Sequence, residues 1–220
     1  MFRLATTFVS LSLVVLPPVW AAGPVVHGRN GLSYFGLRNA TAGQDYFLGI
    51  PFAEPPIGPR RFKPPVAWTG EISEVNATRY GASCEQSIPS TTNNTISEDC
   101  LTLNIWKPTH VTGKLPVMVY IYGGGFYAGE SVLYPGTFLV ERANKIGKPI
   151  IYITINYRLG IYGCEPYYAE NIKQAYDLIL VPPGQAAYDA GGSNLGFKDQ
   201  RLALEWIQQN IQYFGGDSNK

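Results

Sequence analysis

The chain has 220 residues, a formal charge of +1, 45% hydrophobic residues and three cysteines. This length allows one sizeable core without a dense set of disulfides, and the hydrophobic content excludes a disordered chain. Charged residues make up only 15% of the sequence, below the roughly 25% of an average soluble domain, and the lysines and arginines form no cluster. A nucleic-acid partner is therefore disfavoured.

Residues 1–21 have the pattern of a secretory signal peptide. Arg3 precedes an apolar stretch (4–16), and Val19 and Ala21 supply the small residues that a cleavage site requires. The stretch of roughly 13 residues is shorter than the ~20 that cross a bilayer, so we expect no stable membrane anchor. We therefore predict a secreted, extracellular protein whose mature chain, 22–220, begins after Ala21.

Secretion changes how asparagine and cysteine are interpreted. Asn39, Asn76 and Asn93 each begin an N-x-S/T triplet and become candidate glycosylation sites on surface loops. A disulfide between Cys84 and Cys100 would close a polar, turn-rich loop and contribute about 3 kcal/mol. Cys164 would then be left over, either free and buried or waiting for a partner, which could lie outside this chain.

The first half of the mature chain predicts short strands and irregular segments. A proline-rich stretch (51–65) separates the first strands from the next and should form neither helix nor central strand. The predicted strands in this half are 25–28, 32–37, 45–50 and 101–106.

The second half predicts a strand, a helix and a strand in succession. The runs VMVYIY (117–122) and IIYITI (150–155) are continuously apolar, as expected for strands buried on both faces. A helix over 137–146 lies between them, which predicts a βαβ crossover and hence a parallel sheet. The clearest helix follows at 198–214 and ends at a glycine pair. The fold class is α/β.

Three consecutive glycines, Gly123, Gly124 and Gly125, follow the first buried strand. Without side chains, such a turn exposes consecutive backbone N–H groups that a substrate oxyanion can approach. The position at the carboxyl end of a central strand favours ligand binding over a plain tight turn. The spacing of the glycines fits neither phosphate-loop pattern.

The sequence lacks the catalytic nucleophile and general base that would act together with such an oxyanion site. No serine lies in a G-x-S-x-G pattern, the signature of a nucleophile elbow. The two histidines, His27 and His110, are expected on the surface. Neither histidines nor cysteines form a metal-ligand set, so we predict no metal and no cofactor.

Several segments together resemble one family, the type-B carboxylesterases and lipases, or cholinesterase-like α/β-hydrolases, and within it the secreted fungal-type esterases. The resemblance covers nearly the whole mature chain and follows the family's order. It is carried by residues 47–62 (FLGIPFAEPPIGPRRF), 97–106 (SEDCLTLNIW), 122–126 (YGGGF), 156–160 (NYRLG), 199–206 (DQRLALEW) and 214–217 (FGGD).

The resemblance implies an incomplete α/β-hydrolase fold, with the N-terminal strands of the central sheet and the βαβ unit but not the nucleophile elbow. In the family, Gly124 and Gly125 correspond to oxyanion-hole donors, and Gly123 shapes the turn. The resemblance also implies a disulfide and two buried ion pairs. These are Cys84 with Cys100, Arg61 with Glu98, and Arg158 with Asp199. Losing one partner of a buried pair typically costs 3–5 kcal/mol.

The function implied is the N-terminal part of a secreted carboxylic ester hydrolase that acts on a small-molecule or lipid ester. The family's serine, acid and histidine lie downstream of Lys220, so the chain alone should be inactive. One of the two apolar strands should then have an unpaired edge. The alternatives are a non-catalytic interaction or adhesion protein, and a truncated product without function. Cys164–Gln185 is interpreted as an insertion, or as a gene-model error such as a retained intron.

Overall fold

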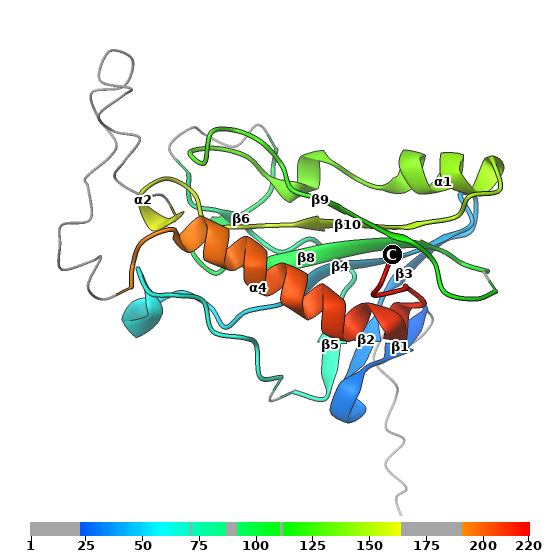
Figure 1. Ribbon diagram of the computed structural model, residues 1–220, viewed down its shortest axis with the longest axis horizontal. Helices are drawn as coiled ribbons and strands as arrows, with labels where there is room; N and C mark the ends of the chain where they lie inside the picture. Colours follow the sequence, from blue (N-terminus) through cyan, green and yellow to red (C-terminus); the bar gives the residue numbers. More distant parts are fainter. Residues whose placement is uncertain (1–22, 71, 87–91, 111, 164–190) are drawn as a thin grey trace, which may run out of the picture.

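The computed structural model describes residues 23–70, 72–86, 92–110, 112–163 and 191–220 (Figure 1). The predicted signal peptide, Cys164 and the predicted insertion lie outside these residues. The strands are β1 (Val25–His27), β2 (Ser33–Phe35), β3 (Leu37–Asn39), β4 (Gln44–Pro51), β5 (Glu74–Asn76), β6 (Ser83–Cys84), β7 (Ile96–Ser97), β8 (Thr102–Pro108), β9 (Val117–Tyr120) and β10 (Ile151–Ile155). The helices are α1 (Thr137–Lys145), α2 (Gly160–Gly163) and α4 (Leu195–Asn210), with short 3-10 helices at Arg29–Gly31, Gly58–Arg60, Ser131–Leu133 and Ile211–Phe214.

A five-stranded mixed sheet, in the order β3-β4-β8-β10-β9, forms the centre of the molecule. The predicted βαβ crossover is confirmed, because β9 and β10 are parallel and α1 connects them. The expectation of a parallel sheet was wrong for the other neighbours, which pair antiparallel. The link from β8 to β9 (109–116) is too short for a crossover helix, so β8 cannot run parallel to that pair.

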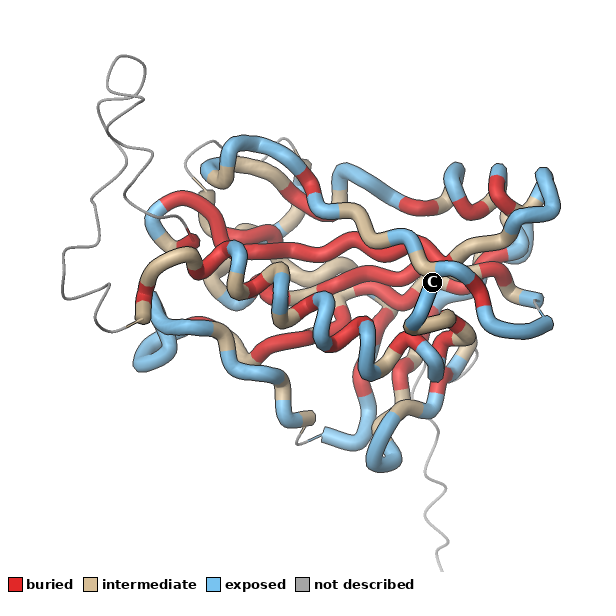
Figure 2. The backbone as a smooth tube through the Cα atoms, in the orientation of Figure 1, coloured by how far each residue is buried: buried red, intermediate tan, exposed pale blue. Residues whose placement is uncertain are grey.

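The alternation of side chains along β8 and β10 divides the core between the two faces of the sheet. Leu103, Ile105 and the three isoleucines of β10 belong to the cluster packed against α4. Trp106 and Tyr152 point to the opposite face and pack with Val140 of α1. Figure 2 shows these strands as the most continuously buried part of the chain. β10 is buried at every residue, as its sequence predicts.

The last helix is confirmed but begins three residues earlier than predicted. α4 starts at Leu195, which is buried, and Gly196 packs against the backbone of Arg158, where a Cβ would lie 2.8 Å from the carbonyl oxygen. This tertiary contact, which local sequence does not encode, holds the first turn in place. Residues 211–214 tighten into a 3-10 helix that ends at Gly215 with φ +88°. No helix in the described ranges is long and apolar enough to cross a membrane.

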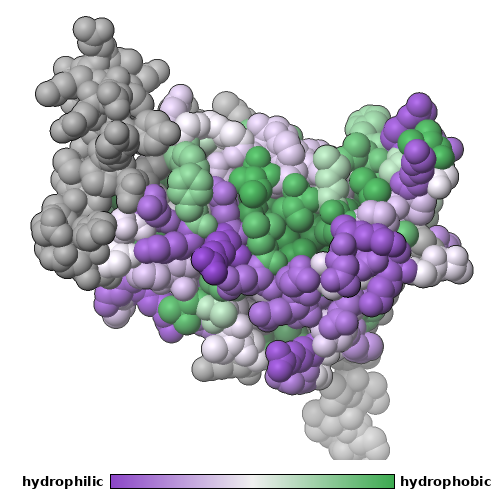
Figure 3. Space-filling view, in the orientation of Figure 1, coloured by the Kyte–Doolittle hydropathy of each residue, from purple (hydrophilic) through white to green (hydrophobic). Residues whose placement is uncertain are grey.

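β9 differs most from its prediction. It ends at Tyr120 rather than at 122, and it is an edge strand rather than a strand buried on both faces. Met118 is 46% exposed and Ile121 is also exposed. Figure 3 shows the resulting hydrophobic surface between α1 and α4. Within the described residues β9 is therefore the edge strand that the sequence predicts for one of its two apolar runs. The edge is only partly open, because the Val117 amide donates a 3.0 Å hydrogen bond to the carbonyl oxygen of Lys220.

A smaller sheet, in the order β1-β2-β5, lies under the end of α4 (Figure 1).

The proline-rich stretch (51–65) departs from expectation at two points. Pro51 is the last residue of β4, which is a central strand, and 58–60 form a turn of 3-10 helix. Pro51 is tolerated because β3 pairs only with Gln44–Tyr46, so its missing N–H interrupts no bond to that neighbour.

Candidate active site

The glycine turn follows the carboxyl end of β9. Gly124 has φ +128° and Gly125 has φ +62°, conformations that favour glycine. The amides of Tyr127 and Ala128 donate to the carbonyl oxygen of Gly124, at 3.2 and 3.3 Å, and close the turn. A Cβ on Gly124 would collide with the carbonyl oxygen of Ala128. The sequence therefore needs glycine at 124 for both conformation and space.

All three glycines are exposed, so a ligand can reach their backbone. Among the described residues, no acceptor takes a hydrogen bond from the N–H of Gly124 or of Gly125. Two adjacent free donors on a fixed turn suit an oxygen that carries negative charge. The structure thus provides the geometry expected of an oxyanion site, while Gly123, with open space around it, only leads into the turn.

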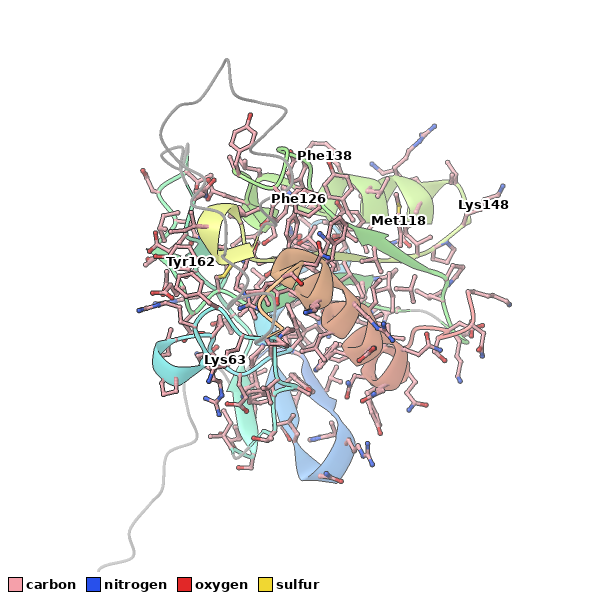
Figure 4. All side chains as sticks on the ribbon, turned by 60° about the vertical axis from the view of Figure 1, so that its left-hand side comes forward. Lys63, Met118, Phe126, Phe138, Lys148 and Tyr162 are labelled. Carbon is pink, nitrogen blue, oxygen red and sulfur yellow. A yellow bond between two sulfur atoms is a disulfide. The ribbon has the colours of Figure 1, made fainter. Side chains whose placement is uncertain are left out.

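Phe126, the residue after the glycines, anchors the turn to α4. It has φ +64°, a conformation that costs a non-glycine residue about 1–3 kcal/mol. Its carbonyl oxygen accepts a 2.7 Å hydrogen bond from Gly160, and its ring lies 4.6 Å from that of Phe197. Figure 4 shows Phe126 beside the first turn of α4. Tertiary contacts therefore hold a conformation that phenylalanine does not prefer.

Buried polar side chains support the end of the turn. Glu130 accepts hydrogen bonds from the hydroxyls of Ser83 and Thr92, at 2.7 and 2.8 Å. Ser131 is also buried, and its amide donates to Asn156 at 3.2 Å. Sequence reasoning missed this network, because isolated Ser, Thr and Asn residues carry no spacing signal.

The disulfide and the turn belong to one structural unit. Cys84 and Cys100 are bonded, with their Cα atoms 5.0 Å apart. Within the loop that they close, Gln86 accepts a 2.9 Å hydrogen bond from the amide of Gly129. The loop expected from the sequence to be an exposed surface element therefore contacts the glycine turn, through Gln86 and through Thr92.

Arg158 and Asp199 form a fully buried ion pair. The guanidinium donates to both carboxylate oxygens at 2.7 and 2.8 Å, and the Arg158 amide adds a bond of 3.0 Å. The side chains are 4% and 0% exposed. Burial raises the pKa of Asp199, and the hydrogen bonds and charge of Arg158 oppose that rise. The pair joins the segment after β10 to α4.

The second ion pair has the predicted partners but not the predicted burial. Arg61 donates two hydrogen bonds of 2.6 Å to Glu98. The Arg61 side chain is 44% exposed and that of Glu98 17% exposed, so water reaches the pair. Arg61 lies in an exposed loop next to the short 3-10 helix.

The three sequon asparagines lie in different surroundings. Asn39 is half-buried, and its Nδ2 donates a 2.7 Å hydrogen bond to the hydroxyl of Tyr46. Asn76 is exposed, and its Oδ1 accepts bonds from the amide and the hydroxyl of Thr78, at 3.2 and 2.7 Å. Asn93 is exposed as well.

Both histidines are exposed. His27 shares a 3.0 Å hydrogen bond with Ser33, but this pair lies in the small sheet, well separated from the glycine turn (Figure 1). In the described ranges, no three His, Cys, Asp or Glu side chains come together as a metal site. The structure therefore brings no histidine to the glycine turn.

Comparison with known sequences identifies the family in which the glycine turn, the disulfide and the ion pairs occur together. Residues 30–172 and 186–220 match the sequence model of the carboxylesterase family. The chain belongs to this family. The match omits 173–185, which fall inside the predicted insertion and outside the described residues.

Relatives in this family include fungal lipases. Lipase 2 of Diutina rugosa is 36% identical over 233 residues, covering 96% of this chain and 39% of the lipase. Secreted lipase 1 of Botryotinia fuckeliana is 37% identical, covering 84% of this chain and 33% of that protein. The crystal structure of EstA from Aspergillus niger is 34% identical with a TM-score of 0.72, covering 89% of this chain and 34% of EstA. The chain thus spans 33–39% of the length of these relatives, and its fold is part of an α/β-hydrolase fold.

Proposed function

We propose that this chain is the N-terminal part of a secreted carboxylic ester hydrolase, to which it contributes two oxyanion donors. The observation that carries the proposal is the pair of N–H groups at Gly124 and Gly125, which bond to no acceptor in the described part of the chain and are held at the carboxyl end of β9 in a chain of this family. A non-catalytic protein has no need of two such exposed donors on a turn whose backbone angles favour glycine.

In the proposed reaction, a serine that lies outside residues 1–220 attacks the ester carbonyl. The carbonyl oxygen gains the negative charge and accepts hydrogen bonds from Gly124 and Gly125. A histidine, oriented by an acid, takes the serine proton and gives it to the departing alcohol, which leaves an acyl-enzyme. Water then releases the acid. This chain supplies the oxyanion donors but no nucleophile, because none of its serines lies in a G-x-S-x-G pattern.

The chain by itself is therefore proposed to be inactive. The full chain is secreted from a yeast host and assayed with p-nitrophenyl butyrate. We expect no turnover above background. Turnover that a fluorophosphonate abolishes would overturn this part of the proposal, because it requires a reactive serine within the chain.

A chimera tests the catalytic role directly. Residues 30–220 replace the matching segment of Diutina rugosa Lipase 2, which supplies the rest of the hydrolase. We expect ester hydrolysis. Alanine at 124 keeps the N–H, but its Cβ would collide with the Ala128 carbonyl and displace the turn, so we expect Gly124→Ala to lower kcat by roughly 10²–10³, the usual effect of losing the hydrogen bond from one oxyanion donor. Gly147→Ala is the control, because Gly147 also has a positive φ but has open space around it.

A folded chimera that hydrolyses no ester would favour the non-catalytic interaction protein. A chimera with equal kcat in the Gly124→Ala variant and its parent would refute the oxyanion role. The truncated, functionless product is tested in the gene, where a stop codon after Lys220 followed by readable family sequence would support it.

The substrate is proposed to be a small-molecule or lipid ester. Phe126 and Tyr127 border the glycines and form a partly exposed aromatic wall, which suits an apolar acyl or alcohol group. Chain-length preference in the chimera, measured with p-nitrophenyl acetate, butyrate and palmitate, would distinguish short esters from lipids.

Secretion and glycosylation complete the proposal. They are supported by the sequence of residues 1–21 and by the name of the Botryotinia relative, a secreted lipase. Asn76 and Asn93 are the proposed glycan acceptors. Asn39 is the poorer candidate, because its amide nitrogen is engaged by Tyr46. Release of the glycans by a glycosidase in ¹⁸O water, followed by peptide mass spectrometry, measures the glycan occupancy of each asparagine separately. Occupancy of Asn39 without Asn76 would contradict the ranking.

A further inference from the structure

Two tyrosines beneath the glycine turn bond to each other's backbone. Tyr122 directly precedes the glycines, and Tyr157 follows β10. The Tyr157 hydroxyl donates a 2.6 Å hydrogen bond to the carbonyl oxygen of Tyr122, and the Tyr122 hydroxyl donates one of 3.3 Å to the carbonyl oxygen of Tyr157. The rings are stacked, with centroids 4.5 Å apart and an interplanar angle of 20°. We call this pair the tyrosine clamp.

The clamp acts on the peptide unit that leads into the turn. The carbonyl of Tyr122 and the N–H of Gly123 share one rigid plane, so fixing the oxygen fixes the orientation of that plane. The glycines that follow have little conformational preference of their own. The bonds that Tyr127 and Ala128 donate to the Gly124 carbonyl fix the plane that carries the Gly125 N–H. The plane that carries the Gly124 N–H lies between that plane and the Tyr122–Gly123 plane, so its direction depends on both.

Further contacts hold the clamp in one arrangement. A Cβ on Gly129 would collide with the Tyr122 ring, so the end of the turn packs directly on the clamp. Phe126 packs edge-on against Tyr157 at 5.7 Å. Both tyrosine side chains are buried. Burial, and then the proximity of Tyr157, raise the pKa of Tyr122, so its hydroxyl stays protonated and can donate.

The other half of the clamp connects to α4. The carbonyl of Tyr157 shares its peptide plane with the amide of Arg158, and that amide donates to Asp199. The buried ion pair and the glycine turn are therefore joined through two peptide planes and a pair of stacked rings. This connection links the glycine turn, β10 and α4 as one rigid platform.

We propose that Tyr157 is a positioning residue for the oxyanion donors, acting through the carbonyl of Tyr122. This inference rests on the proposed function, because it assigns the glycine turn its role. Tyr157 touches no reacting atom in this scheme. It holds the peptide plane before the glycines so that both N–H groups meet the same oxygen, which lowers the reorganisation needed when charge develops.

The test is Tyr157→Phe in the full chain, which keeps the ring and removes the shorter hydrogen bond. In ¹⁵N-labelled protein, we expect lower heteronuclear NOE values at Gly124 and Gly125. We also expect amide exchange at Ala128 and Gly160 to become roughly 2- to 10-fold faster, the effect of losing one net hydrogen bond. Amides in β8 should not change. Tyr34→Phe is the matched control, because Tyr34 is equally buried but its hydroxyl bonds no group among the described residues.

Unchanged values at the two glycines in a folded Tyr157→Phe variant would overturn the positioning role, as would the same changes in Tyr34→Phe. If the variant does not fold, hydroxyl exchange in the unmutated chain still decides. With ¹³Cζ-labelled tyrosine in mixed H₂O and D₂O, we expect separate isotope-shifted signals for Tyr157 and one averaged signal for Tyr34. An averaged Tyr157 signal refutes the clamp. None of these measurements needs ester hydrolysis, so a failure of the positioning role can be distinguished from a failure of the proposed function in the chimera.

Discussion

Replacing Asp199 with asparagine would leave a buried guanidinium without its counter-charge. The carboxylate accepts three hydrogen bonds from Arg158, of 2.7 to 3.0 Å. Asparagine keeps one acceptor oxygen and places an NH₂ group against a donor. Removing one partner of a buried pair costs about 3–5 kcal/mol. For a domain of this length, that loss corresponds to a fall in Tm of roughly 6–20 °C.

Glu98→Gln is the matched comparison, since it makes the same chemical change in the exposed pair. Arg61 and Glu98 also share two short hydrogen bonds, but solvent screens them. We expect this variant to lose about 0.2–1 kcal/mol, the range of surface ion pairs. Both guanidinium–carboxylate contacts are bidentate, so the contrast between the two variants comes chiefly from burial and from the third hydrogen bond that Asp199 accepts from the Arg158 amide.

Urea unfolding, followed by tryptophan fluorescence, measures both losses. The slope of the transition should be the same in each variant, so that the midpoints compare stability directly. The reasoning is refuted if Asp199→Asn costs less than about 1 kcal/mol, or if the two variants lose equal stability, because burial would then not decide the strength of the pair.

Three further changes give separate tests. Replacing Cys84 and Cys100 with serine should cost about 3 kcal/mol of stability, with the difference abolished when the parent is measured in reductant; no loss would contradict the predicted role of the closed loop. Gly129→Ala should destabilise by about 1–3 kcal/mol, because its Cβ meets the Tyr122 ring and its φ of +139° is strained for alanine, and a neutral result by thermal unfolding would contradict that packing. Met118→Lys should reduce concentration-dependent light scattering with less than about 0.5 kcal/mol change in stability; unchanged scattering would mean that the β9 edge does not drive association.

Local patterns in the sequence predicted much of the fold. The apolar run in β10 requires burial on both faces, and the helix between the two runs is long enough for a right-handed crossover. The glycines at 123–125 predict the exposed turn, because the positive φ values at Gly124 and Gly125 favour glycine. The family motifs predict the disulfide partners and both ion pairs. Each of these features depends either on a few adjacent residues or on short motifs that occur along the chain in the same order as in the family.

Tertiary structure decided what depends on neighbours distant in the chain. β9 and β10 read alike in sequence, but β10 lies between two strands while β9 lies at the edge, so only β10 is fully buried. The two ion pairs are likewise predicted in the same way from the sequence, but only Arg158–Asp199, where α4 packs, is shielded from water. The reciprocal bonds between Tyr122 and Tyr157 join residues 35 positions apart, so no local pattern encodes them. The sequence by itself determined which backbone turns and strands form, whereas burial and the direction of hydrogen bonds were set by the layers that pack around them.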